Sequence, residues 1–317
     1  MLGYALRRLT QLIPVLVLAS IIVFSLLRWI PGDPAMIMAG PDASPEVVAA
    51  VRQQMGLDQP LVNQYLIWMS HAVQGDLGKS FVSRQPVLDL IGRRLPATVE
   101  LAVAATVLAV ITAIPLGIIA AVRQRSIFDY VVSALNGVSL AVPNFWLGIL
   151  LVLVFSLYLR WLPPFGWADP FSDPAGGLRF LILPALTLSM HISAVLARFT
   201  RVASLEVLRQ DYVRTAYSKG LGERPVIAGH VLRNALIPVV TVLGIQFGQM
   251  LGGVVIVEAV FSWPGIGQLV LQAILNRDYT VVQGALLVSV GLFLLINLLT
   301  DMVYGFIDPR IRLAHNS

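Results

Sequence analysis

The sequence predicts an all-α polytopic membrane protein with six transmembrane helices, a helical extracytoplasmic insert and a long, patterned cytoplasmic loop. Three observations lead to this fold class: an apolar composition, six long apolar segments, and an uneven distribution of arginines. Hydrophobic residues make up 57% of the 317 residues and charged residues only 12%, whereas soluble domains carry about 25% charged residues. A soluble fold could not bury that much apolar surface, so the solvent must be a bilayer.

Each of the six apolar segments is expected to cross the membrane as a helix, because in lipid every backbone polar group must pair within its own segment. They are Leu9–Leu27, Ala97–Val122, Val131–Leu159, Phe180–Leu196, Ala235–Phe261 and Val281–Ile307, of which Phe180–Leu196 is the shortest. Interior prolines such as Pro143 predict local kinks. The first segment follows Arg7 and Arg8 but is longer than the core of a signal peptide, so it is interpreted as a retained helix.

The arginines predict that both chain ends are cytoplasmic. With the N-terminus inside, most basic residues between spans face the cytoplasm, while the short outer connections hold only Arg160, Arg179 and Arg277. Arg93 and Arg94, beside a membrane entry, argue mildly the other way. The net charge of +5 is therefore interpreted as topology control, with no nucleic-acid partner.

The chain is expected to divide into three parts. These are the N-terminus with the first helix (1–30), an extracytoplasmic helical insert (31–95), and a five-helix core (96–317) with a cytoplasmic loop at about 198–234. The insert has signals for two helices. Ser44-Pro45-Glu46 starts one that Gly56 stops, and a second runs from about Pro60 to Gln74 and ends at Gly75. The insert is either a cap on the outer mouth or also a docking surface for an external partner.

The cytoplasmic loop is predicted to be a helix–glycine–helix unit. Its first helix should span Ser204–Lys219 and end at Gly220 and Gly222, and a second should restart after Glu223 with Pro225. The side chains expected on one face are Leu205, Leu208, Tyr212, Thr215 and Ala216. An interfacial helix on the lipid surface is the alternative, but it usually needs Trp or Phe anchors and a run of lysines. A unit of this kind is better suited to a cleft on another protein.

Polar residues in the spans are candidates to line a path or a subunit interface. They are Gln246, Gln249, Gly252, Glu258 and Asn297. Amides could equally bridge helices, and the small residues around Gly252 could serve ordinary helix packing. Glu258 is late in its segment and Glu100 early, so both are expected near the headgroups, where charges are less costly.

Two other function classes fit less well. An ion-coupled secondary transporter would need intramembrane acids and often internal repeats, but no repeat is clear and the acids lie near the ends of the spans. An intramembrane hydrolase would need a catalytic constellation, and neither a Gly-x-Ser-x-Gly elbow nor a His-Glu-x-x-His pair occurs. With no cysteine, thiolate nucleophiles and cysteine-ligated metals are excluded. The chain is not expected to be an enzyme or to bind a metal.

The loop and its surroundings resemble the permeases of binding-protein-dependent ABC importers, in the dipeptide, oligopeptide and glutathione branch. The resemblance rests on DYVRTAYSKGLGERPVIAGHVLRNALIP at Asp211–Pro238, RNALIPVVTVLGIQFG at Arg233–Gly248 and VEAVFSWPGIGQL at Val257–Leu269. PGDP at Pro31–Pro34, GLDQPL at Gly56–Leu61 and DPRIR at Asp308–Arg312 agree. The general family pattern fits less well, since Arg214-Thr215-Ala216 stands where EAA is expected.

The resemblance implies the first of two permease subunits in an importer of the bacterial inner membrane. A second homologous permease subunit, two ATPase subunits that bind ATP and magnesium, and an extracytoplasmic solute-binding protein would complete it. Residues implied to couple the path to the ATPases are Asp211, Tyr212, Arg214, Thr215, Ala216, Lys219, Gly220, Leu221, Gly222 and Glu223. The substrate stays open among peptides, glutathione and metal chelates.

Overall fold

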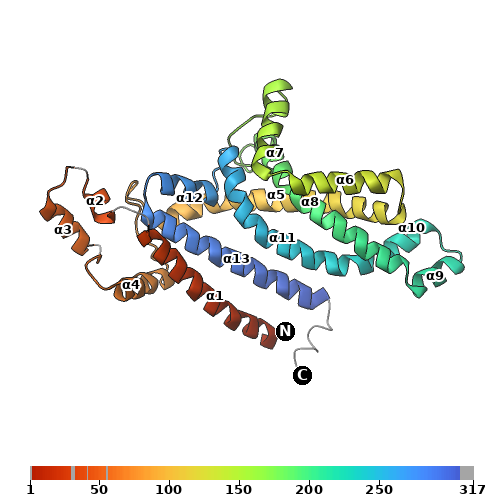
Figure 1. The fold of residues 1–317 in the computed structure, drawn as a ribbon, viewed down its shortest axis with the longest axis horizontal. Helices are drawn as coiled ribbons and strands as arrows, with labels where there is room; N and C mark the ends of the chain where they lie inside the picture. The colour runs from red at the N-terminus through yellow and green to blue at the C-terminus, as the bar shows by residue number, and fades with distance from the viewer. Residues whose placement is uncertain (1, 30–32, 41, 55, 308–317) are drawn as a thin grey trace. The chain divides into compact units, whose positions relative to one another are not determined.

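The computed structural model describes residues 2–29, 33–40, 42–54 and 56–307, and its named elements are all helices (Figure 1). The chain separates into two compact units. Unit 1 comprises Met1–Pro96 and Gly265–Leu294, and unit 2 comprises Ala97–Pro264 and Leu295–Ser317. Unit 1 therefore holds the predicted insert together with the first helix and residues 265–294.

Unit 1 holds the first four helices, the start of α5, all of α12 and the first half of α13. Their bounds are α1 Leu2–Trp29, α2 Pro34–Ala39, α3 Pro45–Gln54, α4 Leu61–Val73, α5 Val87–Val122, α12 Ile266–Leu275 and α13 Tyr279–Ile307. Its core forms where α5, α12 and α13 pack, around Val87, Ile266 and Ala285. A Cβ atom on Gly284 would lie 2.7 Å from Val87 Cγ1, so only glycine allows this approach of α13 to α5.

The helix signals of the insert are confirmed. The Val47 N–H group donates to Ser44 Oγ at 3.4 Å at the start of α3. Gly56 and Gly75 follow α3 and α4 with φ of +66° and +84°, a conformation that favours glycine. The apolar stripe of α4 is only half-buried, and it contacts α1 through Tyr65 and Phe24, whose ring centroids are 5.4 Å apart.

A buried carboxylate organises the connection between α4 and α5. Asp278 caps the start of α13 and is 4% exposed. It accepts hydrogen bonds from Ser80 Oγ at 2.5 Å and from the Phe81 N–H group at 3.2 Å. Ser80, which closes a Gly-Lys-Ser tripeptide reminiscent of phosphate-binding loops, therefore serves to fasten this loop to α13.

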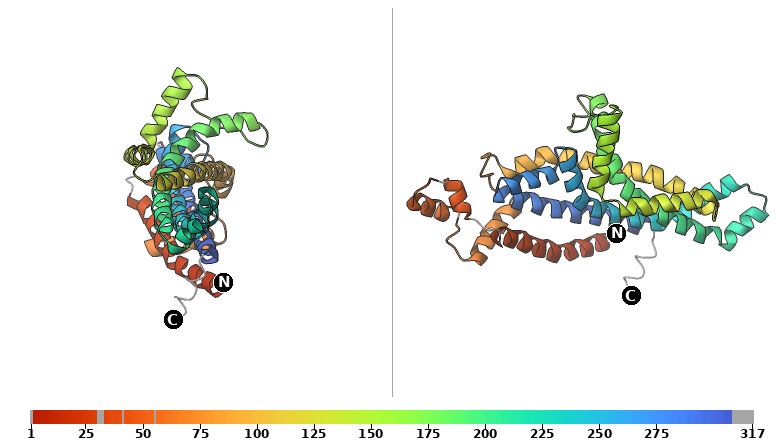
Figure 2. Two further views of the ribbon diagram at one scale, coloured as in Figure 1. Left: turned by 90° about the vertical axis from the view of Figure 1, so that its right-hand side faces the viewer. Right: turned by 45° about the horizontal axis from the view of Figure 1, so that its top comes forward.

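Unit 2 holds the remaining helices around a core with Phe261 and Trp263 among its largest buried side chains. The bounds are α6 Ile127–Ala141, α7 Asn144–Leu151, η1 Val152–Tyr158, α8 Pro174–Leu208, α9 Asp211–Ser218, α10 Glu223–Val226, η2 Ile227–Leu232 and α11 Arg233–Val260. The η elements are π-helices. Helix α8 packs against α6, α7 and α11, and α9 and α10 follow at its C-terminal end (Figures 1 and 2).

The structure supports a polytopic membrane protein, although the count of six spans stays a prediction. Four helices are long and apolar enough to cross a bilayer, and a bent pair makes a fifth candidate among the described residues. In α1 the apolar stretch Thr10–Ser25 is shorter than the 18 residues required of a candidate span. The segment Phe180–Leu196, expected to be the shortest span, lies within the 35 residues of α8.

The third predicted span, Val131–Leu159, is not one kinked helix. The chain forms α6 and then α7 with η1, and these two helical pieces meet at an angle of 105°. Pro143 explains the break. It disfavours helical backbone at the preceding residue, and Val142 is accordingly extended, with φ −84° and ψ 123°. The expectation of a mild kink underestimated this effect.

Candidate functional site

The candidate site is the loop of residues 209–232, named here the α9–α10 loop. The expected helix Ser204–Lys219 is wrong as a continuous element, because α8 ends at Leu208 and α9 begins at Asp211. Gln210 lies between them in an extended conformation, with φ −74° and ψ 146°. Asp211 lies in the first turn of α9, where the positive end of the helix dipole stabilises a carboxylate.

The break gives α9 a new buried face. Val213, Ala216 and Val226 form a small core that Val207 and Leu208 complete. Tyr212 and Thr215, predicted to share the apolar face, are exposed. The predicted apolar face assumed one continuous helix over residues 204–219. The extended residue at 210 changes the direction in which the side chains of α9 point, so a different set of residues is buried.

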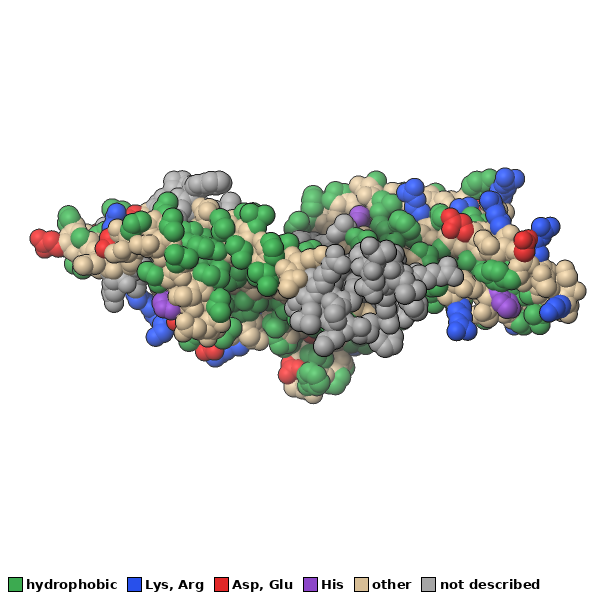
Figure 3. Space-filling view, turned by 90° about the horizontal axis from the view of Figure 1, so that it is seen from below, with side chains coloured by type: hydrophobic (Ala, Val, Ile, Leu, Met, Phe, Trp, Pro, Cys, Tyr) green, Lys and Arg blue, Asp and Glu red, His purple; other side chains and the backbone are tan. Residues whose placement is uncertain are grey.

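The predicted coupling residues lie on α9 and on the turn and helix start that follow it. All ten are exposed except Ala216, which belongs to the small core. Tyr212 and Leu221 are 44% and 43% exposed, so apolar surface lies beside the basic Arg214 and Lys219. Basic side chains also gather over the part of unit 2 that holds α9 and α10 (Figure 3). This mixture of apolar and basic groups is suited to binding another protein.

A glycine turn closes α9. The Gly220 N–H group donates to the Tyr217 carbonyl at 2.9 Å, and the Leu221 N–H group donates to the Ala216 carbonyl at 3.3 Å. These two bonds define a Schellman motif, which needs a left-handed residue after the helix. Gly220 supplies it with φ +83°, whereas Gly222 has an ordinary φ of −66°. The predicted helix end is confirmed.

The returning chain contacts α9 before it enters α11. The rings of Tyr212 and His230 have centroids 6.2 Å apart. His230 lies in η2, and π-helices occur often at functional sites. The sequence reasoning missed both Val226 and His230, and an apolar residue after the restart at Glu223 was the available signal for Val226.

The candidates within the spans lie on α11 and α13, and their predicted role stays a prediction. Gln246 is 7% exposed and Asn297 is half-buried. The surroundings of Gln249 and Gly252 within α11 are not described. Glu258, near the end of α11, is fully buried and accepts a hydrogen bond from Thr98 Oγ1 at 2.7 Å, and its headgroup position stays a prediction.

Glu100 lies further from its helix start than the predicted span implied, and its position relative to the headgroups stays a prediction. Helix α5 begins at Val87, ten residues before the predicted start of the span, which places Glu100 well inside the helix. The side chain is half-buried, and its Oε2 atom accepts a hydrogen bond from Trp167 Nε1 at 3.0 Å. Trp167 thus supplies one hydrogen-bond donor to this half-buried carboxylate within unit 2.

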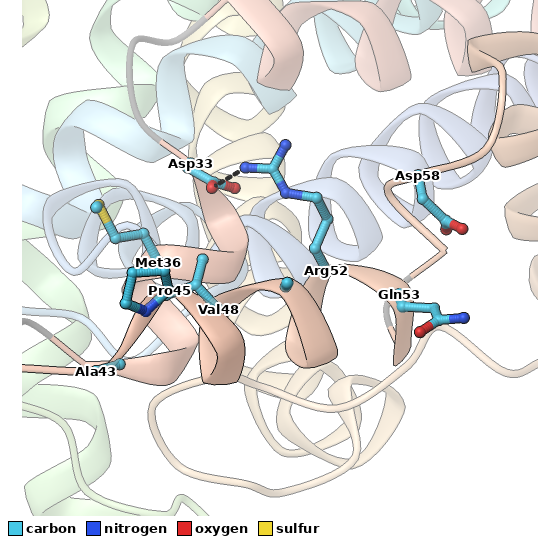
Figure 4. A pocket seen from close by; sticks show the side chains of 9 residues that line it. Asp33, Met36, Ala43, Pro45, Val48, Arg52, Gln53 and Asp58 are labelled. Atoms are coloured by element: carbon cyan, nitrogen blue, oxygen red, sulfur yellow. Dashed lines mark hydrogen bonds and ion pairs between the residues drawn. The ribbon is translucent and has the colours of Figure 1, made fainter.

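Unit 1 carries a groove in the insert, with a volume of about 610 Å³. Its floor is mostly apolar, with Met36, Pro45 and Val48 close together, and Arg52 reaches across to form an ion pair with Asp33 (Figure 4). Both charged side chains are partly exposed, so the pair is expected to contribute only about 0–1 kcal/mol. Docking of an external partner on the insert stays a prediction.

Comparison with known proteins covers almost the whole chain. Residues 113–313 match the family described as binding-protein-dependent transport system inner membrane component, and residues 1–102 match its N-terminal companion. The glutathione transport system permease proteins GsiC of Escherichia coli (strain K12) and Shigella flexneri serotype 5b (strain 8401) are each 46% identical over 312 residues, 98% of this chain and 99% of theirs.

A crystal structure of an amino acid ABC transporter with histidines aligns with 70% of this chain and 94% of its own, at 15% identity and a TM-score of 0.48. The assignment rests instead on the two family matches and on the full-length relatives. This chain belongs to the family of inner-membrane components of binding-protein-dependent transport systems.

Proposed function

We propose that this chain forms half of the translocation path of an importer for short peptides of the glutathione class, and that the α9–α10 loop couples the path to ATP hydrolysis. The coarse assignment follows from family membership. The chain is a multi-pass inner-membrane permease subunit of an ABC importer, and it is not an enzyme. Such a subunit works with a partner permease, ATPase subunits and a binding protein. An ion-coupled secondary transporter is not favoured.

The observation that carries the coupling role is the construction of α9. Its inner face is held by Val213, Ala216 and Val226, so the helix has a support of its own. Its outer face presents Tyr212, Arg214 and Tyr217 to the surroundings, and the exposed Lys219 and Leu221 follow directly after the helix. A short helix that is supported from behind moves as a unit when a partner displaces it, because packed elements shift together.

The proposed assembly contains one second homologous permease subunit and two ATPase subunits. The chain offers one α9–α10 loop, and two permease subunits would offer two, one for each ATPase. ATP and magnesium are proposed to bind on the ATPase subunits. The α9–α10 loop and both chain ends are proposed to be cytoplasmic, with the insert on the outer side, where a solute-binding protein would deliver substrate.

The substrate proposal is supported by the two relatives at 46% identity, which are named for glutathione transport. The test uses the whole assembly in vesicles with its binding protein and ATP. We expect ATP-dependent uptake of labelled glutathione that excess unlabelled dipeptide reduces less than excess unlabelled glutathione does. Stronger competition by the dipeptide would move the substrate to the dipeptide class. Uptake driven by an ion gradient without ATP would overturn the importer assignment itself.

A further inference from the structure

A buried ion pair joins α6 to α8 in unit 2. Arg201 Nε and Nη2 donate to the two carboxylate oxygens of Asp129 at 2.6 and 2.7 Å. This is the bidentate geometry that arginine forms with carboxylates. The side chain of Asp129 is 4% exposed and that of Arg201 is 26% exposed. A pair this enclosed is not a surface ion pair, because removing one partner leaves the other charge buried.

The carboxylate of Asp129 also shapes the turn between α5 and α6. Its Oδ2 atom accepts a hydrogen bond from the Arg125 N–H group at 3.0 Å. Arg125 has φ +61°, a left-handed conformation that is uncommon for a residue with a side chain. Ser126 caps α6 by accepting from the Asp129 N–H group at 3.3 Å. One carboxylate therefore ties together the turn, the start of α6 and α8.

Close packing one turn away makes this junction rigid. A Cβ atom on Gly117 would lie 2.6 Å from Thr200 Cβ and 2.7 Å from the Ala197 carbonyl oxygen, so α5 approaches the backbone of α8. This close approach joins α5 to the same stretch of α8 that carries Arg201.

The position of Arg201 relates the junction to the candidate site. Seven residues further along, α8 ends at Leu208, and that leucine already packs on the small core beneath α9. Any displacement of α9 therefore acts on the same end of α8 that holds Arg201. Through Asp129, Arg201 connects this end of α8 to α6 and to the turn between α5 and α6.

We propose that Asp129 and Arg201 are positioning residues that transmit the movement of the α9–α10 loop from α8 to the α5–α6 hairpin. This inference rests on the proposed coupling function. Without the pair, α9 still binds its partner and ATP is still hydrolysed, but α5 and α6 no longer follow α8. The quantity that should change is therefore the substrate imported per ATP hydrolysed, not the amount of complex.

The test measures assembled complex, ATPase activity and uptake for Asp129→Asn and Arg201→Lys in the complete reconstituted importer. Arg201→Lys keeps the charge but loses the bidentate geometry. We expect uptake per ATP to fall about tenfold in Asp129→Asn, and less in Arg201→Lys. The exchanged pair Asp129→Arg with Arg201→Asp should restore part of the ratio. Arg123→Gln, which removes an exposed charge from the same turn, should leave it unchanged.

A purely structural pair gives a different pattern. Uptake and ATPase activity would then fall together with the amount of complex, with an unchanged ratio, and that result would overturn the proposal. If Asp129→Asn does not assemble, the ratios of Arg201→Lys and of the exchanged pair decide in the same way. A normal ratio in these variants, with a low ratio in Gly220→Val, rejects this inference but leaves the coupling role of the loop intact.

Discussion

Replacing Gly220 by valine is the sharpest test of the α9–α10 loop as a coupling element. Gly220 follows α9 with φ +83°, and a Cβ atom built there meets nothing within 4 Å. The substitution therefore causes no collision, and its cost comes from the backbone conformation alone. For a residue with a side chain that cost is about 1–2 kcal/mol, with the upper value suited to a β-branched residue.

This energy is small for the whole fold but large for α9. The helix has eight residues, and the two turn bonds from Gly220 and Leu221 close its end. If the chain relieves the strain by abandoning the left-handed conformation, both bonds are lost and α9 frays near Ala216. A shift of about 1.4 kcal/mol changes the ratio of intact to frayed loop about tenfold. We expect uptake to fall by up to about that factor while the helical bundle stays folded.

The assay compares assembled complex, basal ATPase activity and substrate uptake between wild type and Gly220→Val. Gly222→Ala is the matched control, because Gly222 has φ −66° and a Cβ atom there makes only ordinary contact with Pro225, at 3.9 Å. The expected result is low uptake with retained ATPase activity, or weak assembly, in the Gly220 variant alone. Normal uptake together with normal ATPase activity would refute the reasoning, and equal losses in both variants would remove the role of the left-handed turn.

Three further predictions follow from the same structure. In this cysteine-free chain, a single cysteine at the exposed Gln59 should react with an impermeant reagent in intact cells and one at Ser218 should be protected; the reverse labelling would contradict the proposed topology. Vesicles that contain this chain alone should not transport, because it supplies half of a path, and any specific uptake by them would contradict the two-subunit proposal. Asp278→Ala should lower the free energy of unfolding by about 2–4 kcal/mol, since it leaves buried donors unpaired, while Ser80→Ala should cost about 1 kcal/mol. Equal thermal stability of Asp278→Ala and wild type would show that this anchor is not needed.

Local signals in the sequence were sufficient for several elements of the fold. Ser44 and Gly56 mark the two ends of α3, and Gly75 and Gly220 mark the ends of α4 and α9. These signals work because a cap or a left-handed residue acts on the chain within three or four positions. The composition likewise determined the bilayer as solvent, because it depends only on how much apolar surface must be covered.

The sequence was misleading wherever a helix had to end without a strong local signal or where distant segments meet. Gln210 breaks the predicted helix Ser204–Lys219 without a glycine or proline, so the buried face of α9 rotated away from the expected one. The break at Pro143 was visible as a proline, but its angle of 105° was not, and α7 packs on α8 and α11, which lie far along the chain.

By itself the sequence determined the class of this protein, its membrane environment and the loop that marks its family, because these depend on composition and on residues close together in the chain. Only the tertiary structure decided which side chains stand behind the loop and which carboxylates are enclosed. The partnership of Asp129 with Arg201 spans 72 positions, and that of Ser80 with Asp278 spans 198. No local pattern contains such pairings, because they form only when packed helices bring the two side chains out of water together.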